Sequence, residues 1–503
     1  MTKEKNKIIL VIILILISLI TLVGSSYALL TKSFKSKKLS MEVGTLKIDF
    51  AEGNAINMAN AAPMTDSNGL KSTPYTFTIT NGGDINAYYT VSNEEELANT
   101  LDTSYLRMKL TGSDGYDSGI KTVKELGTET YKLIDDTLLE TGKSVTYELR
   151  MWISQDAGND IQDKIYKSKI VVNGTSNKLP LATDKILAKA NPENLDYNSA
   201  TDAQKKEMWT FTHEATEQTT ALTDYRYIGA DPNNYVKFND ELWRIIGVFD
   251  TDDGKGKVEK RLKIIRNESI GNYSWDNKDT TTGAETAYGK NEWTDARLNY
   301  LLNPGHESET NGGSLYWNRK SGTCYKGQNN STTSCDFTST GLTDTAKSMI
   351  GDAKWYLGGS STYNDVTPPM FYTRERGTTV YSGHSTSWIG KVGLMYPSDY
   401  GYATSGGSST NRNSCLAKEL YNWDSSGYSD CKNNDWMYNG NIWQWTMSPR
   451  ADSSNYVFGV INTGYVISND ANDPFAGRPV VYLKSTIKVI SGSGTTSSPY
   501  ILG

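Results

Sequence analysis

Histidine and cysteine are scarce in this sequence, with three His and four Cys among 503 residues. The zinc-protease motif HExxH does not occur, and no two cysteines have the short spacing that zinc ribbons use. These absences argue against the common structural and catalytic zinc sites. A surplus of basic residues is also missing, because 51 Lys and Arg stand against 57 Asp and Glu. The net charge of −6 offers nucleic acid no broad basic surface, so we expect no nucleic-acid partner.

The composition is that of a folded, multidomain protein. A length of 503 residues predicts two or three domains. Charged residues make up 21% and hydrophobic residues 37%, which is ordinary for globular domains and unlike disordered chains. The sequence also holds 32 Tyr and 12 Trp. Such rigid rings are common in extracellular binding domains, although the same rings also fill hydrophobic cores.

The N-terminus carries the features of an export signal. Three lysines precede an apolar run that is unbroken over residues 8–17, and the small residues Ser26 and Ala28 follow it. This order is typical of a signal peptide, and residues 1–30 are also long enough to span a bilayer. Two alternatives therefore stay open, a cleaved signal peptide or a retained transmembrane helix that anchors the protein in the membrane. Both predict an extracellular, cell-surface location.

The four cysteines fall into two pairs that are close in sequence, Cys324 with Cys335 and Cys415 with Cys431. Both intervals are polar and resemble loops. In an oxidising compartment, two short-range disulfide bonds are the simplest account. A four-thiolate zinc site is the alternative.

Residues 41–178, after a basic linker over residues 31–40, show the alternation of β-strands. Residues 46–50 alternate cleanly between apolar and polar side chains, residues 75–80 and 87–91 also read as strands, and residues 144–153 and 167–172 are rich in β-branched and aromatic residues. Asn81-Gly82-Gly83 predicts a tight turn that would make residues 87–91 the hairpin partner of residues 75–80. Several short strands between turns predict an antiparallel, immunoglobulin-like β-sandwich.

This first part of the chain resembles the TasA/camelysin family of exported Gram-positive proteins. The similarity rests on the signal segment ending VGSSYA, the strand GTLKIDF and the run PYTFTITNGG. The resemblance implies a β-sandwich outside the cell. Some members of that family build matrix fibres and some are described as metallopeptidases. Because HExxH is absent, we transfer the fold and the location to this chain and not the peptidase activity.

A change in composition marks a second domain, because eleven of the 12 Trp lie beyond residue 205. We expect a linker with one short helix over residues 179–204, an α+β domain over residues 205–490 and a tail over residues 491–503. Strands are predicted over residues 225–228, 235–238, 242–249 and 257–266. Asn239-Asp240 suits a tight hairpin turn between the second and third of them.

Two helices are predicted in this domain. Thr294-Asp295 would cap the first, with Leu298, Leu301 and Leu302 on one face. Thr343-Asp344 would cap the second. Its apolar face would comprise Ala346, Met349, Ile350, Ala353 and Leu357.

The end of the chain resembles the C-type lectin fold in its bacterial branch, which includes formylglycine-generating enzymes and the variable proteins of diversity-generating retroelements. NGNIWQWT over residues 439–446 matches their GNVWEWT-like strand, a hairpin follows around Asn462-Thr463-Gly464, and AGRPVVYL closes the domain. Gly477-Arg478 matches the family's GFR motif only in part, because the Phe is missing. The resemblance implies a C-type-lectin-like α+β fold for roughly the last half of the chain.

The enzyme branch of that fold family depends on a cysteine just after the GFR motif. Pro479 stands there in this sequence, and the last cysteine is Cys431. Asp424, Asp430 and Asp435 would raise the pKa of a nearby thiol and so disfavour a reactive thiolate. We therefore expect no enzyme activity, and an oxidoreductase of the formylglycine-generating type is the least favoured hypothesis.

The binding hypothesis rests on the side chains that this fold displays between Trp443 and Gly477. Tyr would supply rigid contact area and Asn and Asp adaptable hydrogen bonds. The predicted binding residues are Trp443, Gln444, Arg450, Asp452, Asn455, Tyr456, Tyr465, Asn469, Asp470, Asn472 and Asp473. A solvated hairpin without a ligand is the plain alternative.

We expect no cofactor, with calcium as the one open alternative. Its candidate ligands are Asp424, Asp430, Asn433, Asn434 and Asp435. Asx-rich loops of this kind also occur as ordinary turns.

Taken together, the patterns predict an adhesin-type protein whose lectin-like domain binds an extracellular protein or glycan at the end of a β-sandwich stalk. The alternative is a structural subunit of an extracellular matrix or filament that assembles through residues 41–178.

Overall fold

The structure is a computed structural model that describes residues 32–34, 46–52, 62–95, 99–126, 130–158, 161–176 and 178–503. The apolar segment over residues 1–30, from which we predict a signal peptide or anchor, lies outside these ranges. Of the expected linker over residues 31–40, the structure describes the strand β1 alone. Within the ranges that are described, no helix has both the length and the apolar character needed to cross a bilayer.

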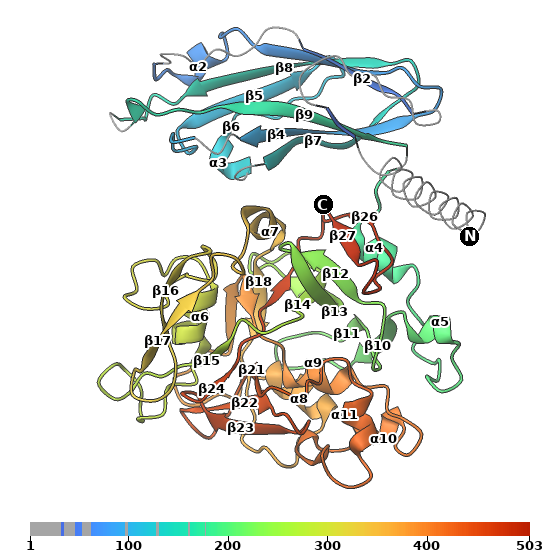
Figure 1. Cartoon of the computed structure of the whole chain (residues 1–503), viewed down its shortest axis with the longest axis vertical. Helices are drawn as coiled ribbons and strands as arrows, with labels where there is room; N and C mark the ends of the chain where they lie inside the picture. The colour runs from blue at the N-terminus through green and yellow to red at the C-terminus, as the bar shows by residue number, and fades with distance from the viewer. Residues whose placement is uncertain are drawn as a thin grey trace, which may run out of the picture. The chain divides into compact units, whose positions relative to one another are not determined.

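The chain forms two compact units, residues 1–179 and residues 180–503 (Figure 1). Unit 1 contains two antiparallel sheets. The four-stranded sheet has the order β1(Lys32–Phe34), β9(Ser168–Thr175), β4(Ala87–Glu95), β7(Thr130–Leu139). The five-stranded sheet has the order β2(Ile48–Glu52), β3(Tyr75–Asn81), β8(Ser144–Ile153), β5(Leu106–Gly112), β6(Lys121–Thr122). The short helix α2(Asp66–Gly69) lies between β2 and β3 of one sheet, and α3(Val123–Leu126) lies between β6 and β7 of different sheets.

Period-2 alternation builds the core of unit 1. Phe77 and Ile79 of β3 are fully buried and lie opposite Tyr147 and Val145 of β8. They share one hydrophobic cluster with residues of the other sheet, among them Val91 of β4. The Tyr147 hydroxyl also lies 2.6 Å from the hydroxyl of Tyr89 on β4, so this buried polar pair is satisfied. The predicted antiparallel, two-sheet organisation is therefore present.

One pairing in unit 1 differs from the prediction. β3 pairs with β2 and β8, whereas β4 pairs with β7 and β9, so residues 75–80 and 87–91 are not hairpin partners. The turn after β3 instead carries the chain from one sheet to the other. Buried Asn81 holds this crossing, because its Nδ2 donates to the carbonyls of Ile85 and Leu139 at 2.8 and 2.9 Å.

Unit 2 is built around a nine-stranded sheet. Its main path runs β20(Val392–Gly393), β25(Val480–Tyr482), β14(Val258–Arg266), β13(Glu241–Asp252), β12(Tyr235–Phe238), β27(Tyr500–Leu502), β26(Val489–Ser491). β11(Leu222–Arg226) joins β13 and carries β10(Trp209–His213). The second sheet has the order β15(Asn272–Ser274), β24(Pro474–Ala476), β21(Gln444–Pro449), β22(Tyr456–Val460), β23(Val466–Asp470). Two hairpins complete the strands, β16(Ser321–Tyr325) with β17(Thr332–Asp336) and β18(Ala353–Tyr356) with β19(Ser387–Gly390).

Short helices connect these strands. They are α4(Ala182–Leu187), α5(Asp202–Lys205), η2(Trp293–Asp295), α6(Arg297–Leu302), α7(Asp344–Met349), α8(Pro368–Glu375), α9(Pro397–Tyr402), α10(Arg412–Leu416), η3(Leu420–Asn422) and α11(Ser429–Asn433). Figure 1 shows α8 to α11 beside the second sheet, at one end of unit 2.

The segments expected as linker and tail belong to unit 2. Ala182 and Ile186 of α4 are 1% exposed, and the Ala182 amide donates to the carbonyl of Ile487 at 2.7 Å. The tail forms β27, whose Tyr500 and Leu502 are buried. Burial of these apolar side chains removes them from water and explains why both segments pack here rather than remain as connectors.

Several local predictions in unit 2 are confirmed. Asn239 and Asp240 form the β12–β13 turn with φ values of 57° and 60°, as a two-residue hairpin turn requires. The Thr343 hydroxyl caps α7 by accepting from the Ala346 amide at 3.1 Å. In α6 the predicted apolar face is buried, but Ala296 is the N-cap and the preceding residues form η2.

The second predicted helix is too long. α7 ends at Met349 with Ile350 as its C-cap, and Ala353 begins the strand β18. Gly351 follows the C-cap, and its amide donates to the carbonyl of Tyr482 at 2.9 Å. The apolar spacing that matched a helix therefore comes from core residues of two different elements.

The tryptophans of unit 2 mainly fill its core. Nine of the eleven are less than a tenth exposed, namely Trp209, Trp243, Trp275, Trp293, Trp317, Trp355, Trp423, Trp436 and Trp445. Trp443 is 39% exposed. The high tryptophan content of unit 2 is therefore mainly a consequence of core packing. Exposed aromatic side chains are found among the tyrosines.

Candidate functional site

The predicted binding region is a β-hairpin that packs against the helix α8. β22 and β23 pair in register from Tyr456 opposite Asp470 to Val460 opposite Val466. Phe458 of β22 packs edge-to-face on Phe371 of α8. At the turn, Gly464 has a φ of 93°, which favours glycine. Strand pairing and the contact with α8 thus hold the strands of the hairpin in place, and Gly464 allows its turn.

Four tyrosines and one arginine from separate segments meet beside this hairpin. We call Tyr363, Tyr421, Tyr456, Tyr465 and Arg450 the tyrosine face. The ring centroids of Tyr363 and Tyr421 are 5.2 Å apart, and those of Tyr421 and Tyr465 are 5.4 Å apart, both edge-to-face. Tyr456 is 37% exposed and the other three rings are partly exposed. Three rings of the face are therefore in contact with one another, and all four tyrosines are at least partly exposed to solvent.

Arg450 links Tyr456 to Tyr363 and so to the other two rings of the tyrosine face. Its guanidinium carbon lies 5.3 Å from the Tyr363 ring centroid and 5.7 Å from that of Tyr456. Its Nε donates to Asp452 Oδ1 at 2.7 Å and its Nη1 to Ser468 Oγ at 3.3 Å. The guanidinium is therefore held in place before any ligand arrives.

Two loops contribute residues that the sequence did not identify. Tyr363 lies in the loop between β18 and α8, and Tyr421 in η3. The Leu420 amide donates to the carbonyl of Val366 at 3.0 Å and so fixes η3 beside that loop. The signal available in the sequence was the high Tyr content of residues 358–449, but a ring's exposure cannot be read from content.

Most of the other predicted binding residues lie on the surface of this region. Trp443 packs edge-to-face on Phe475 and donates its Nε1 to Asn462 Oδ1 at 3.0 Å. Asp452, which binds Arg450, is exposed. Asn469 and Asp470 at the end of β23 and Asp473 in the turn after it are partly exposed. The structure thus brings most of the predicted set together around one hairpin.

Three predicted binding residues are buried instead. Gln444 is 1% exposed, and its Oε1 accepts from Arg478 Nη1 at 2.9 Å. Asn472 is fully buried and its Nδ2 donates to the carbonyl of Ala287 at 3.3 Å. Asn455 is 8% exposed and bonds to Asp470. These buried side chains hydrogen-bond to other residues of unit 2, so they hold the region in place and do not face solvent.

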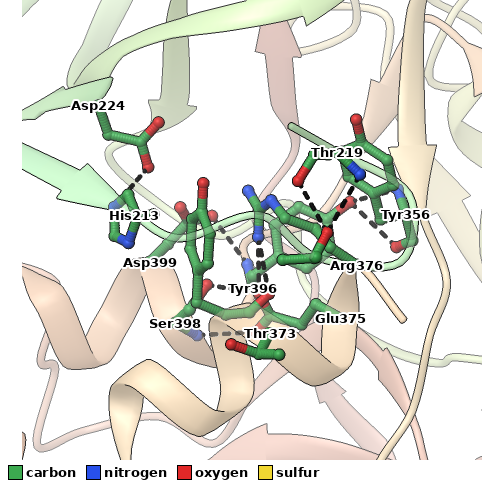
Figure 2. A network of polar contacts seen from close by, with 12 residues as sticks. His213, Thr219, Asp224, Tyr356, Thr373, Glu375, Arg376, Tyr396, Ser398 and Asp399 are labelled. Atoms are coloured by element: carbon green, nitrogen blue, oxygen red, sulfur yellow. Dashed lines mark hydrogen bonds and ion pairs between the residues drawn. The ribbon is translucent and has the colours of Figure 1, made fainter. Parts of the chain in front are cut away.

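A second cluster of polar residues lies buried beneath the helices α8 and α9 (Figure 2). Arg226 donates to Asp224 Oδ2 at 2.9 Å and to Asp399 Oδ1 at 3.0 Å. Lys263 Nζ lies 2.5 Å from Asp399 Oδ2. Glu375 accepts from the Ser398 amide at 2.9 Å and from its hydroxyl at 2.5 Å. The ion pairs of Asp399 tie α9 to β11 and β14, and the hydrogen bonds of Glu375 tie α8 to α9.

Burial shifts the protonation equilibria in this ion cluster. It raises the pKa of Glu375 to about 7, and it lowers the pKa of Lys263 to about 8 although Asp399 opposes that change. Burial also lowers the pKa of His213, whose Nε2 lies 3.1 Å from Asp224 Oδ2.

Shifted pKa values are common at catalytic centres, but the hydrogen bonds of this cluster are those of a structural network. The Ser398 hydroxyl donates to Glu375 and not to His213, so these residues do not form a Ser-His-Asp relay. His213 stacks on Tyr372 with ring centroids 3.8 Å apart. The charged side chains of the cluster are all less than a tenth exposed.

Both predicted cysteine pairs form disulfide bonds. Cys324–Cys335 links β16 to β17, and Cys415–Cys431 links α10 to α11. All four sulfurs belong to buried residues. The second bond stiffens the helical loop region that carries Tyr421.

Three of the candidate calcium ligands form hydrogen bonds with backbone groups. Asp430 Oδ2 accepts from the amides of Ser409 and Thr410, and Asp435 Oδ1 accepts from the Met437 amide at 2.8 Å. Asn434 Nδ2 donates to the carbonyl of Asp430 at 3.0 Å. In the described part of the chain, no group of three or more His, Cys, Asp or Glu side chains is arranged to hold a metal ion.

A small hollow lies beside the β16–β17 hairpin and is lined by residues that include Glu307, Glu309 and Lys320. Its volume of about 140 Å³ is below the roughly 300–1,000 Å³ of small-molecule pockets. We therefore regard the tyrosine face as the better candidate site.

Comparisons with protein families, with curated proteins and with solved structures give no match to this chain. The function has to be inferred from its own residues.

Proposed function

We propose that this protein is exported to the cell surface and that unit 2 binds an extracellular ligand through the tyrosine face, as an adhesin does. The observation that carries this proposal is the meeting of Tyr363, Tyr421 and Tyr465 with Arg450 on one surface. Tyr and Arg are, with Trp, the residues most enriched at the energetic centres of protein interfaces. Here they come from four segments of the chain and are already ordered by one another, so little entropy is lost on binding.

The fold proposed for unit 2 is C-type-lectin-like. The chain order supports it, since residues 439–446 lead into β21, β22 and β23 follow as a hairpin, and residues 476–483 contain β25. Arg478 of the partial GFR motif is 6% exposed and holds Gln444 of the preceding motif at 2.9 Å. The contact between the two motifs supports their joint use as a structural unit. Unit 1 is proposed as a TasA-like β-sandwich stalk.

Export is proposed from the N-terminal segment and from the disulfide bonds, which are typical of oxidising compartments. We propose that the chain is not an enzyme. The hydrogen bonds that occupy Ser398 and the burial of the ion cluster support this view.

The test is a screen of the full-length chain, produced in an oxidising compartment, on glycan and surface-protein arrays. A variant with Arg450, Tyr456 and Tyr465 all changed to Ala serves as the probe of the face. Val258→Ala serves as the matched control, because Val258 is 60% exposed but lies on β14. Binding that the triple change abolishes and the control retains supports the proposal. Absence of any ligand for the folded protein contradicts it.

A further inference from the structure

The end of β23 and the turn that follows it place two carboxylates next to the tyrosine face. Asp470 lies directly opposite Tyr456 in the β22–β23 register. Directly opposed residues of an antiparallel pair project to the same side of the sheet, about 5 Å apart at their Cβ atoms. Asp473 follows in the same turn, and its amide donates to the carbonyl of Asp470 at 3.0 Å. Both side chains are partly exposed.

Neither carboxylate has a cationic partner. Asp452 is neutralised by Arg450, but neither Asp470 nor Asp473 forms an ion pair with any residue of the described ranges. Burial raises the pKa of both carboxyls, and the negative charge of Asp473 raises that of Asp470 further. Two like charges in partial burial are unfavourable, and a ligand cation would relieve them.

The same turn is rich in hydrogen-bond acceptors. Asp470 Oδ1 accepts from Asn455 Nδ2 at 2.5 Å, and Asp473 Oδ2 accepts from Asn469 Nδ2 at 3.4 Å. The Oδ1 atoms of Asn469 and Asn472 accept no hydrogen bond, but both atoms are buried. The acceptors open to a ligand are therefore the carboxylate oxygens of the partly exposed Asp470 and Asp473. A ligand that complements this turn has to bring donors, and an ammonium or guanidinium group carries donors alone.

We propose, on the basis of the proposed function, that the partner of the tyrosine face is a basic segment of a protein, with an Arg or Lys side chain docked between Tyr456 and the pair Asp470–Asp473. The cation contacts the carboxylates while its stem and charge lie against the aromatic ring. The acceptor-rich turn repels anionic glycans and offers neutral glycans no charge complement. A basic peptide can pair its positive charge with the two carboxylates and pack its side-chain stem on the Tyr456 ring.

The test measures the affinity of the full-length chain for an arginine-rich peptide, with a glutamate-rich peptide and calcium chloride as alternative probes. The variant is Asp470→Asn with Asp473→Asn, which keeps the shape of both side chains. The matched control is Asp184→Asn with Asp202→Asn, because these exposed carboxylates change the net charge equally. They lie in the first turns of α4 and α5, away from β23 in Figure 1.

We expect the arginine-rich peptide to bind the wild type and to lose at least about tenfold in affinity with the Asp470/Asp473 variant. The control pair should change the affinity by less than about twofold, and added salt should weaken binding of the wild type. Equal losses for both pairs would mean attraction by net charge alone and would overturn the proposal. Specific binding of the glutamate-rich peptide, or of calcium at Asp470 and Asp473, would also overturn it.

The failure of this inference differs from failure of the proposed function. If an arrayed ligand is lost with Tyr456→Ala and Tyr465→Ala but retained by the Asp470/Asp473 variant, the basic partner is wrong and the binding function stands. If neither arrayed ligands nor peptides bind the folded chain, the binding function itself fails.

Discussion

Tyr400 donates its hydroxyl to the carbonyl of Gly464 at 2.7 Å, and this bond links the helix α9 to the turn of the β22–β23 hairpin, which carries part of the tyrosine face. Tyr400 belongs to α9 and is fully buried. Asp399, its neighbour in sequence, lies at the centre of the buried ion cluster. The helix α9 therefore connects the ion cluster to the hairpin of the tyrosine face. The contribution of these contacts to the stability of unit 2 can be measured.

Tyr400→Phe should destabilise unit 2 by about 1–3 kcal/mol, because it leaves the buried Gly464 carbonyl without its donor. Urea unfolding followed by tryptophan fluorescence measures this change, since eleven of the 12 Trp lie in unit 2. Tyr438→Phe is the control, because its hydroxyl also donates to a hairpin carbonyl, that of Asn462, but in an exposed position. A midpoint equal to that of the wild type for Tyr400→Phe would contradict the role given to this bond.

Asp399→Asn should cost about 3–5 kcal/mol, because it removes the negative charge that Arg226 and Lys263 share in a buried site. Asp452→Asn removes an exposed ion pair with Arg450 and should cost about 0–1 kcal/mol. The same unfolding measurement compares the two. Similar effects of both changes would show that the buried cluster contributes no more than a surface pair.

The stability of unit 2 should depend on pH through Glu375. Its pKa rises from 4.5 to about 7 on folding, so its contribution is complete below pH 4.5 and is lost as the pH rises through about 7. His213, whose pKa is lowered, acts in the opposite direction over part of this range.

The contribution of Glu375 is isolated by comparison with Glu375→Gln. Between those two pH values the wild type should lose up to about 1.4 kcal/mol per pH unit relative to the variant. Unfolding midpoints over that interval provide the measurement. Parallel pH profiles would show that Glu375 titrates normally.

Loss of the Cys415–Cys431 bond should lower the stability of unit 2 by about 2–4 kcal/mol, as expected for a short structural loop. Cys415→Ser with Cys431→Ser is the change, and unfolding under oxidising conditions is the measurement. Cys324→Ser with Cys335→Ser provides the comparison for the other loop. A variant of normal stability that loses a catalytic turnover would instead favour the oxidoreductase hypothesis.

The sequence was sufficient to predict features that depend on a few neighbouring residues, such as a turn, a helix cap or a short-range disulfide bond. Asn239-Asp240, the Thr343 cap and the two cysteine pairs were predicted because their chemistry acts over a few residues. The partners of β3 and β4 were not, since strand pairing depends on contacts far apart in sequence.

The candidate site could be predicted only in part for the same reason. The hairpin and most of its surface residues were identified from one continuous segment. Tyr363 and Tyr421 were missed because they reach the face only through folding of distant loops. The burial of Gln444 was missed because both faces of β21 are covered, and that of Asn472 was missed because polar residues between strands are usually exposed.

The most direct measurement is the affinity of a ligand identified on the arrays for the full-length wild type, for Tyr363→Ala with Tyr421→Ala, and for Val258→Ala. Tyr363 and Tyr421 lie outside the hairpin, so they test the assembled face rather than the hairpin alone. We predict a loss of about 2 kcal/mol or more for the tyrosine pair and no change for Val258→Ala. Unchanged affinity of the tyrosine pair in a folded protein would contradict ligand binding by the tyrosine face.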